Sequence, residues 1–65
     1  MLTIEEKKAM DSSNLDTLIS KLKEGKKNSD HRLIEQMEFD IKRFIIDTIF
    51  LDLQKRAIAA IKNDH

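Results

Sequence analysis

The most densely apolar part of the chain runs from Ile41 to Leu53 and reads IKRFIIDTIFLDL, in which eight of thirteen residues are large and apolar. A helix that is apolar around most of its circumference has to be covered on more than one side. A chain of 65 residues has little material of its own with which to do this. The stretch therefore predicts a partner chain, most simply another copy of the same protein.

The apolar positions change face within this region. At about 100° per residue, one set clusters on one side of a helix and the next set is centred more than a quarter turn away. The first set is Ile34, Met37, Ile41, Phe44 and Ile45, and the second is Ile46, Ile49, Phe50, Leu53, Ala57, Ala60 and Ile61. A bend near Asp47 would let one chain use both faces, whereas a straight helix would offer the second face to a partner.

Upstream, the pattern predicts two shorter helices. A Thr-x-x-Glu capping box at Thr3 predicts a helix over residues 4–10. The run Asp-Ser-Ser-Asn at 11–14 prefers caps and turns. A helical stripe of leucines and isoleucine then predicts a second helix over 14–24, ending where Gly25 is expected in the left-handed C′ position. One helix from 3 to 24 is the alternative, and a break or kink is preferred.

The last predicted helix runs from about residue 30 to residue 62, with Ser29 or Asp30 as its cap, because neither proline nor glycine interrupts it. The sequence therefore predicts a single all-α domain over residues 1–65. We expect an unequal helical hairpin, with a short N-terminal helix or helices and one long C-terminal helix, assembling into a homo-oligomeric helical bundle.

Composition strengthens the expectation of self-association. Domains of this size usually need disulfides, a metal or oligomerisation for stability. The chain has no cysteine and two histidines, so oligomerisation is favoured, and neither cofactor nor metal is expected. Twelve basic and twelve acidic residues argue against a strongly basic nucleic-acid binder. The charged N-terminal segment argues against a secretory signal. Asp47 and Asp52 interrupt the apolar tract, which argues against a membrane span. We expect a cytoplasmic protein.

Two groups of acidic residues are candidates for a metal site or for acid–base catalysis. His31, Glu35 and Glu38 share a helix face and could ligate a divalent metal, but a solvated first helical turn is the better interpretation. The carboxylates Asp40, Asp47 and Asp52 are better explained by ion pairs than by acid–base catalysis, and Asp52 could set the register between chains. The sequence therefore predicts a protein without enzymatic activity.

A lysine-rich segment offers a second kind of function. Lysines near the predicted turn could contact phosphates, together with one arginine beyond it. These residues are Lys21, Lys23, Lys26, Lys27 and Arg32. No aromatic residue lies among them to stack on bases. A dimeric nucleic-acid-associated regulatory protein is therefore the alternative, and binding of the apolar segment to a membrane surface is a weaker one.

The run LIEQMEFDIKR over Leu33–Arg43 is similar to the second helix of the Sda family. These are short helical hairpins of Gram-positive bacteria that inhibit sporulation histidine kinases. The resemblance covers eleven of 65 residues, and the chain departs from the family in its apolar extension and its N-terminal segment. It implies that a small helical hairpin can act by binding the helices of another protein.

These observations predict a small protein-interaction module, such as a regulator, inhibitor or adaptor, that binds itself and another protein through a helical surface. The anchors are expected among the apolar residues of the C-terminal half. The predicted oligomer or partner interface consists of Phe44, Ile45, Ile49, Phe50, Leu53, Ala57 and Ile61.

Overall fold

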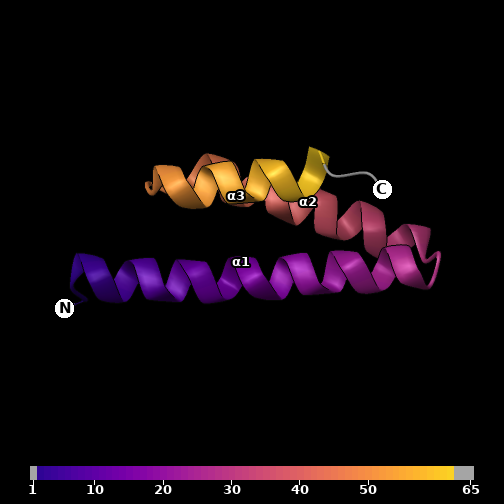
Figure 1. Ribbon diagram of the computed structural model, residues 1–65, viewed down its shortest axis with the longest axis horizontal. Helices are drawn as coiled ribbons and strands as arrows, with labels where there is room; N and C mark the ends of the chain where they lie inside the picture. The colour runs from indigo at the N-terminus through magenta and orange to yellow at the C-terminus, as the bar shows by residue number, and fades with distance from the viewer. Residues whose placement is uncertain (1, 63–65) are drawn as a thin grey trace.

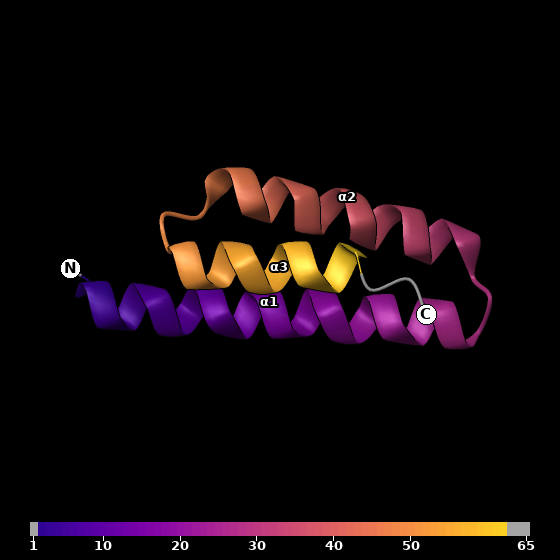
Figure 2. The same cartoon turned by 45° about the horizontal axis from the view of Figure 1, so that its top comes forward.

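The computed structural model describes residues 2–62, which form three helices. These are α1 (Ile4–Lys27), α2 (His31–Asp47) and α3 (Leu51–Lys62), and no strand occurs within this range. The chain reverses direction twice, so that α2 is antiparallel to α1 and α3 runs parallel to α1 again (Figures 1 and 2). The elongated molecule measures 40 × 18 × 15 Å. The prediction of an all-α protein is confirmed.

Helix α1 begins at the predicted cap and then continues through the predicted break. The Thr3 hydroxyl oxygen accepts a hydrogen bond from the Glu6 backbone N–H at 3.1 Å. The separation into helices over 4–10 and 14–24 is wrong, because the helix is continuous from Ile4 to Lys27. Contacts with α3 on both sides of residues 11–14 hold this stretch helical: Lys8 pairs with Asp52, and Asp16 pairs with Arg56. Tertiary contacts of this kind override weak local propensity.

The end of α1 also differs from the prediction. Ser29, rather than Gly25, takes the left-handed conformation, with a φ of 53°. The Asp30 N–H donates to the Gly25 carbonyl at 2.9 Å and the Ser29 N–H to the Lys26 carbonyl at 3.3 Å, which is the Schellman arrangement. Gly25 lies inside the helix, where a Cβ would meet Ile34 Cγ1 at 3.2 Å. This glycine therefore permits close packing of α1 against α2 rather than ending α1.

The predicted helix over 30–62 is interrupted, so the hairpin with one long C-terminal arm is wrong. Asp30 caps α2 as expected, accepting from the Leu33 N–H at 3.2 Å. Helix α2 then stops at Asp47, and the first helix, with 24 residues, is the longest. Thr48 is extended and buried, and its hydroxyl accepts from the Phe50 N–H at 3.3 Å just before α3 begins. Thr48 thus supplies a local cap at the break.

Gln54 completes the break from the other side. Its side-chain Nε2 donates to the Ile45 carbonyl at 3.0 Å and to the Thr48 carbonyl at 3.3 Å. The last carbonyls of a helix have no partner within that helix and need one elsewhere. One amide from the first turn of α3 therefore satisfies the end of α2 and the connection, and holds the two helices in their antiparallel arrangement.

Replacing Gln54 with leucine should lower the free energy of unfolding by about 1–2 kcal/mol, because two partly buried carbonyls lose their donor. Urea unfolding followed by circular dichroism measures the change. Gln36→Leu is the matched control, since the Gln36 amide donates only to the exposed Asp40 on its own helix, at 3.0 Å. Equal effects of the two substitutions would contradict the role of Gln54 at the break.

The core is built from all three helices. Each contributes two almost completely buried apolar side chains: Leu15 and Leu22 from α1, Met37 and Ile41 from α2, and Leu53 and Ala57 from α3. Half-buried apolar residues surround them: Leu18, Ile19, Leu33, Ile34, Phe44, Ile45, Phe50 and Ile61. The break between α2 and α3 thus folds the second apolar set back onto the chain itself.

Candidate interaction surface

The residues predicted to form an interface between chains mostly serve the chain's own core. Leu53 and Ala57 are 3% and 0% exposed. Phe44, Ile45, Phe50 and Ile61 are half-buried against the core, and of the predicted set only Ile49, in the connection before α3, is strongly exposed, at 70%. Their use between chains stays a prediction. The sequence could not reveal this internal use without the position of the break.

A different set of apolar side chains remains exposed on α2 and α3. Phe39 and Ile46 lie seven residues apart on α2, and Leu51 and Ile58 lie seven residues apart on α3, so each pair occupies one helix face. Their exposed fractions are 59%, 78%, 63% and 38%. The sequence pattern placed Ile46 in the second apolar set, the one that a straight helix would offer to a partner, and did not single out the other three. The spacing of seven residues within each pair is the sequence signal that could have identified them.

Both pairs point away from α1. Phe44 lines a pocket together with α1 residues, and Arg56 hydrogen-bonds Asp16 of α1, so these side chains mark the α1 side of α2 and α3. At about 100° per residue, each exposed pair lies roughly 140–160° around its helix from that marker. Helices α2 and α3 lie side by side across from α1 (Figures 1 and 2). We call this the outer face, defined by Phe39, Ile46, Leu51 and Ile58.

The outer face carries an excess of basic side chains. Lys42 and Arg43 lie between the two apolar residues of α2, and Lys55 and Lys62 alternate with those of α3; all four are exposed. Of the nearby carboxylates, Asp47 pairs with Arg43 of the outer face itself at 3.2 Å, and Asp52 turns to Lys8 of α1, so the lysines carry the basic excess. Glu35 remains as an exposed acid on the same side of α2.

Two ion pairs connect α1 to α3. Lys8 Nζ lies 2.6 Å from Asp52 Oδ2, and Arg56 pairs with Asp16. The Arg56 guanidinium also donates to the Ser12 hydroxyl at 3.4 Å. Reversing α3 on α1 would bring like charges together, so these pairs favour the parallel arrangement. The sequence suggested that Asp52 could set the register between chains. In the structure, its ion-pair partner lies in the same chain.

The pair with Lys8 makes stability depend on pH. Its hydrogen bond to the carboxylate lowers the pKa of Asp52 below the ordinary value of 3.8. A lowered pKa in the folded state adds stability that is complete above the unfolded value and is lost as the pH falls through the folded value. Asp52→Asn should therefore destabilise the protein near neutral pH, with the difference shrinking below about pH 4. Urea unfolding of both proteins across this range measures it. A constant difference would contradict the assignment.

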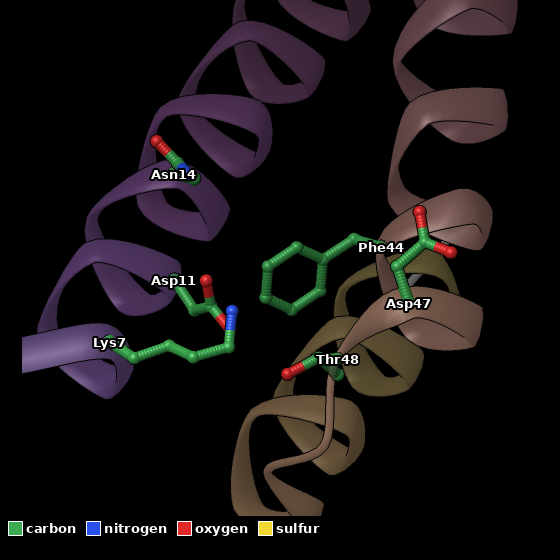
Figure 3. Close-up of a pocket in the computed structure, with 6 residues that line it drawn as sticks. All are labelled: Lys7, Asp11, Asn14, Phe44, Asp47 and Thr48. Atoms are coloured by element: carbon green, nitrogen blue, oxygen red, sulfur yellow. The ribbon is translucent and has the colours of Figure 1, made fainter. Parts of the chain in front are cut away.

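A pocket lies between α1 and the end of α2, with a volume of about 150 Å³ (Figure 3). The Phe44 ring forms one wall, and Lys7 and Asp11 of α1 point toward it. Asn14, Asp47 and Thr48 complete the lining. One cation and two carboxylates at an open hollow are typical of a hydrated edge of an interface between helices. The lining contains no histidine.

The basic residues proposed to contact nucleic acid lie toward one end of the molecule. Lys21, Lys23 and Lys27 are exposed on the C-terminal half of α1, Lys26 is half-buried, and Arg32 is exposed in the first turn of α2. The short turn at 28–30 joins the two helices at this end (Figure 1). Their contact with nucleic acid stays a prediction.

Two further features are absent from residues 2–62. There, no group of three or more histidine, aspartate or glutamate side chains is arranged to hold a metal ion. His31 and Glu35 are exposed, and Glu38 is half-buried. In the same range, none of the helices combines the length and apolar character needed to cross a bilayer. No family model, curated protein or solved structure matches this chain.

Proposed function

We propose that this chain is a small non-enzymatic protein-interaction module, a regulator, inhibitor or adaptor, that binds another helical surface through its outer face. The observation that carries the proposal is that Phe39, Ile46, Leu51 and Ile58 remain exposed on one side of a chain this small. Large exposed apolar side chains on one side of a small protein mark an interaction site. Its basic surroundings add electrostatic selectivity to an apolar contact.

The proposed anchors are the apolar residues exposed on the outer face, rather than the residues expected from the sequence. Leu53 and Ala57 hold α3 in place, which positions Leu51 and Ile58 one helix face away. Ile49 extends the outer face into the connection at its end. An aromatic and several aliphatic anchors with a basic rim suit a partner helix that packs along α2 and α3.

Site-specific photo-crosslinking tests this proposal. A photo-reactive amino acid in place of Ile46 should crosslink a protein in cells that produce this chain. The same group in place of Asn28, which is exposed in the turn between α1 and α2, is the control. A crosslinked protein at position 46 above the control level supports the proposal, whether that protein is foreign or a second copy. Equal labelling at both positions would sink it.

The alternative, a nucleic-acid-associated regulatory protein, is supported by the position of Lys21, Lys23, Lys27 and Arg32 at the turn end of the molecule. Electrophoretic mobility shifts on double-stranded DNA and structured RNA at low and high salt test it, because binding to phosphates weakens as salt rises. Loss of the shift in Lys23→Glu/Lys27→Glu would support this function. The absence of any shift at low salt would remove it.

A further inference from the structure

The charges of this neutral chain are distributed unevenly over its surface. The outer face carries Lys42, Lys55 and Lys62, none of which forms an ion pair within residues 2–62, and the exposed Glu35 lies on the same side of α2. In the first turns of α1 the lysines turn inward: Lys8 reaches Asp52, and Lys7 lines the pocket beside Phe44. The neighbouring Glu5 and Glu6 are left exposed. One side of the molecule is therefore basic, and the N-terminal half of α1 is acidic on its outside.

The outside of α1 has the shape to receive another pair of helices. Ala9, Ser13, Thr17 and Ser20 recur at helical spacing on the side opposite Leu15 and Leu22, and all four are exposed. Small side chains let two helices approach closely. Met10 and Leu2, 53% and 56% exposed, add apolar contacts beside them. We call this surface the α1 back, defined by Ala9, Met10, Ser13, Thr17 and Ser20.

We propose, building on the proposed function, that the outer face binds the α1 back of a second copy of the chain. Charge complementarity carries the assignment, because Glu5 and Glu6 of one copy would meet Lys42 and Lys55 of the next. A symmetric pair through two outer faces would instead bring lysines together.

This contact uses two different surfaces on each copy, so it does not close on itself. Each bound copy presents a fresh outer face or a fresh α1 back, and association continues from copy to copy. The average mass in solution should therefore rise steadily with concentration rather than stop at a dimer. The contact should also weaken with salt, because charges at its rim contribute to it.

Two variants with one blocked surface each provide the test. Ala9→Arg/Ser13→Arg adds bulk and positive charge to the α1 back. Ile46→Glu/Lys55→Glu replaces an apolar side chain and a positive charge of the outer face with two negative charges. All four positions are exposed, so circular dichroism should show an unchanged helical fold. Asn28→Glu, in the turn between α1 and α2 and away from both surfaces, is the control that should associate like the original chain.

Sedimentation equilibrium up to about 1 mM separates the outcomes. Each blocked variant alone should be monomeric, and a 1:1 mixture should form a dimer of the two variants and stop there. A closed dimer of Ala9→Arg/Ser13→Arg alone would overturn the proposal in favour of symmetric pairing. A monomeric original chain would overturn it too. If position 46 still crosslinks a foreign protein in that case, the proposed function survives.

Discussion

Replacing Ile41 with alanine should lower the free energy of unfolding by about 2–5 kcal/mol. Its side chain is fully buried between the three helices, so truncation removes apolar contacts and leaves a cavity lined by the remaining core residues. Because small domains have total stabilities near the low end of about 5–15 kcal/mol, the variant should be largely unfolded or close to it at 37 °C. Urea unfolding at 25 °C, followed by helical circular dichroism, measures the loss.

Ile46→Ala is the matched control for this experiment. It makes the same chemical change in the same helix, but Ile46 is 78% exposed, whereas Ile41 is 0% exposed. The control should change the free energy of unfolding by less than about 0.5 kcal/mol. Similar losses at both positions would mean that the outer side of α2 is buried in the folded state. That result would contradict the division between core and outer face.

Replacing Phe50 with alanine should lower the free energy of unfolding by about 2–3 kcal/mol, less than for a fully buried phenylalanine. Its ring packs against the core at the start of α3, and Lys8 Nζ lies 6.0 Å from the ring centroid. Its backbone also begins α3, since the Gln54 N–H donates to the Phe50 carbonyl at 3.0 Å. Removing the ring loosens the point at which α3 turns back onto α1.

The neighbouring substitution Ile49→Ala should leave folding almost unchanged, because Ile49 is 70% exposed. It should instead weaken binding at the outer face, which extends to this residue. Measuring both unfolding and association for the two variants distinguishes a core role from a surface role. Loss of stability in Ile49→Ala comparable to that in Phe50→Ala would contradict the conformation assigned to residues 48–50.

The helical character and the caps of the helices could be predicted from local sequence. Thr3 and Asp30 cap α1 and α2 because their side chains accept backbone hydrogen bonds in the first turn. The change of apolar face near Asp47 correctly indicated that a straight helix could not bury both sets on one chain. These signals act over three to seven residues and depend little on the rest of the fold.

The break at residues 48–50 and the continuity of α1 could not be predicted in the same way. The break depends on Gln54, whose amide reaches back nine residues to the Ile45 carbonyl. The continuity of α1 over 11–14 depends on ion pairs with α3, more than thirty residues away in sequence. These contacts exist only after the helices have assembled. A sequence pattern therefore cannot show which local conformational preference will be overridden by tertiary contacts.

The break at residues 48–50, which the sequence did not predict, also explains why the sequence assigned these apolar residues to an interface between chains. With one long helix, Leu53 and Ala57 belong to a face that lacks cover, and an interface between chains follows naturally. With the break, the same residues enter the core, and the residues left outside are Phe39, Ile46, Leu51 and Ile58. The outer face is therefore the surface at which binding to a partner should be tested.

Both the fold and the outer face require α3 to pack against α1 of the same chain. Carbodiimide crosslinking tests this packing directly. The reagent joins a lysine and a carboxylate in contact without adding atoms, and Lys8 Nζ lies 2.6 Å from Asp52 Oδ2. Chains labelled with ¹⁴N or ¹⁵N are unfolded together, refolded, crosslinked and analysed by mass spectrometry. We expect crosslinked peptides joining Lys8 and Asp52 that carry a single isotope, and none in Asp52→Asn. Lys8–Asp52 peptides that join a ¹⁴N segment to a ¹⁵N segment would show that α3 packs on a partner chain, which would contradict the fold and the outer face derived from it.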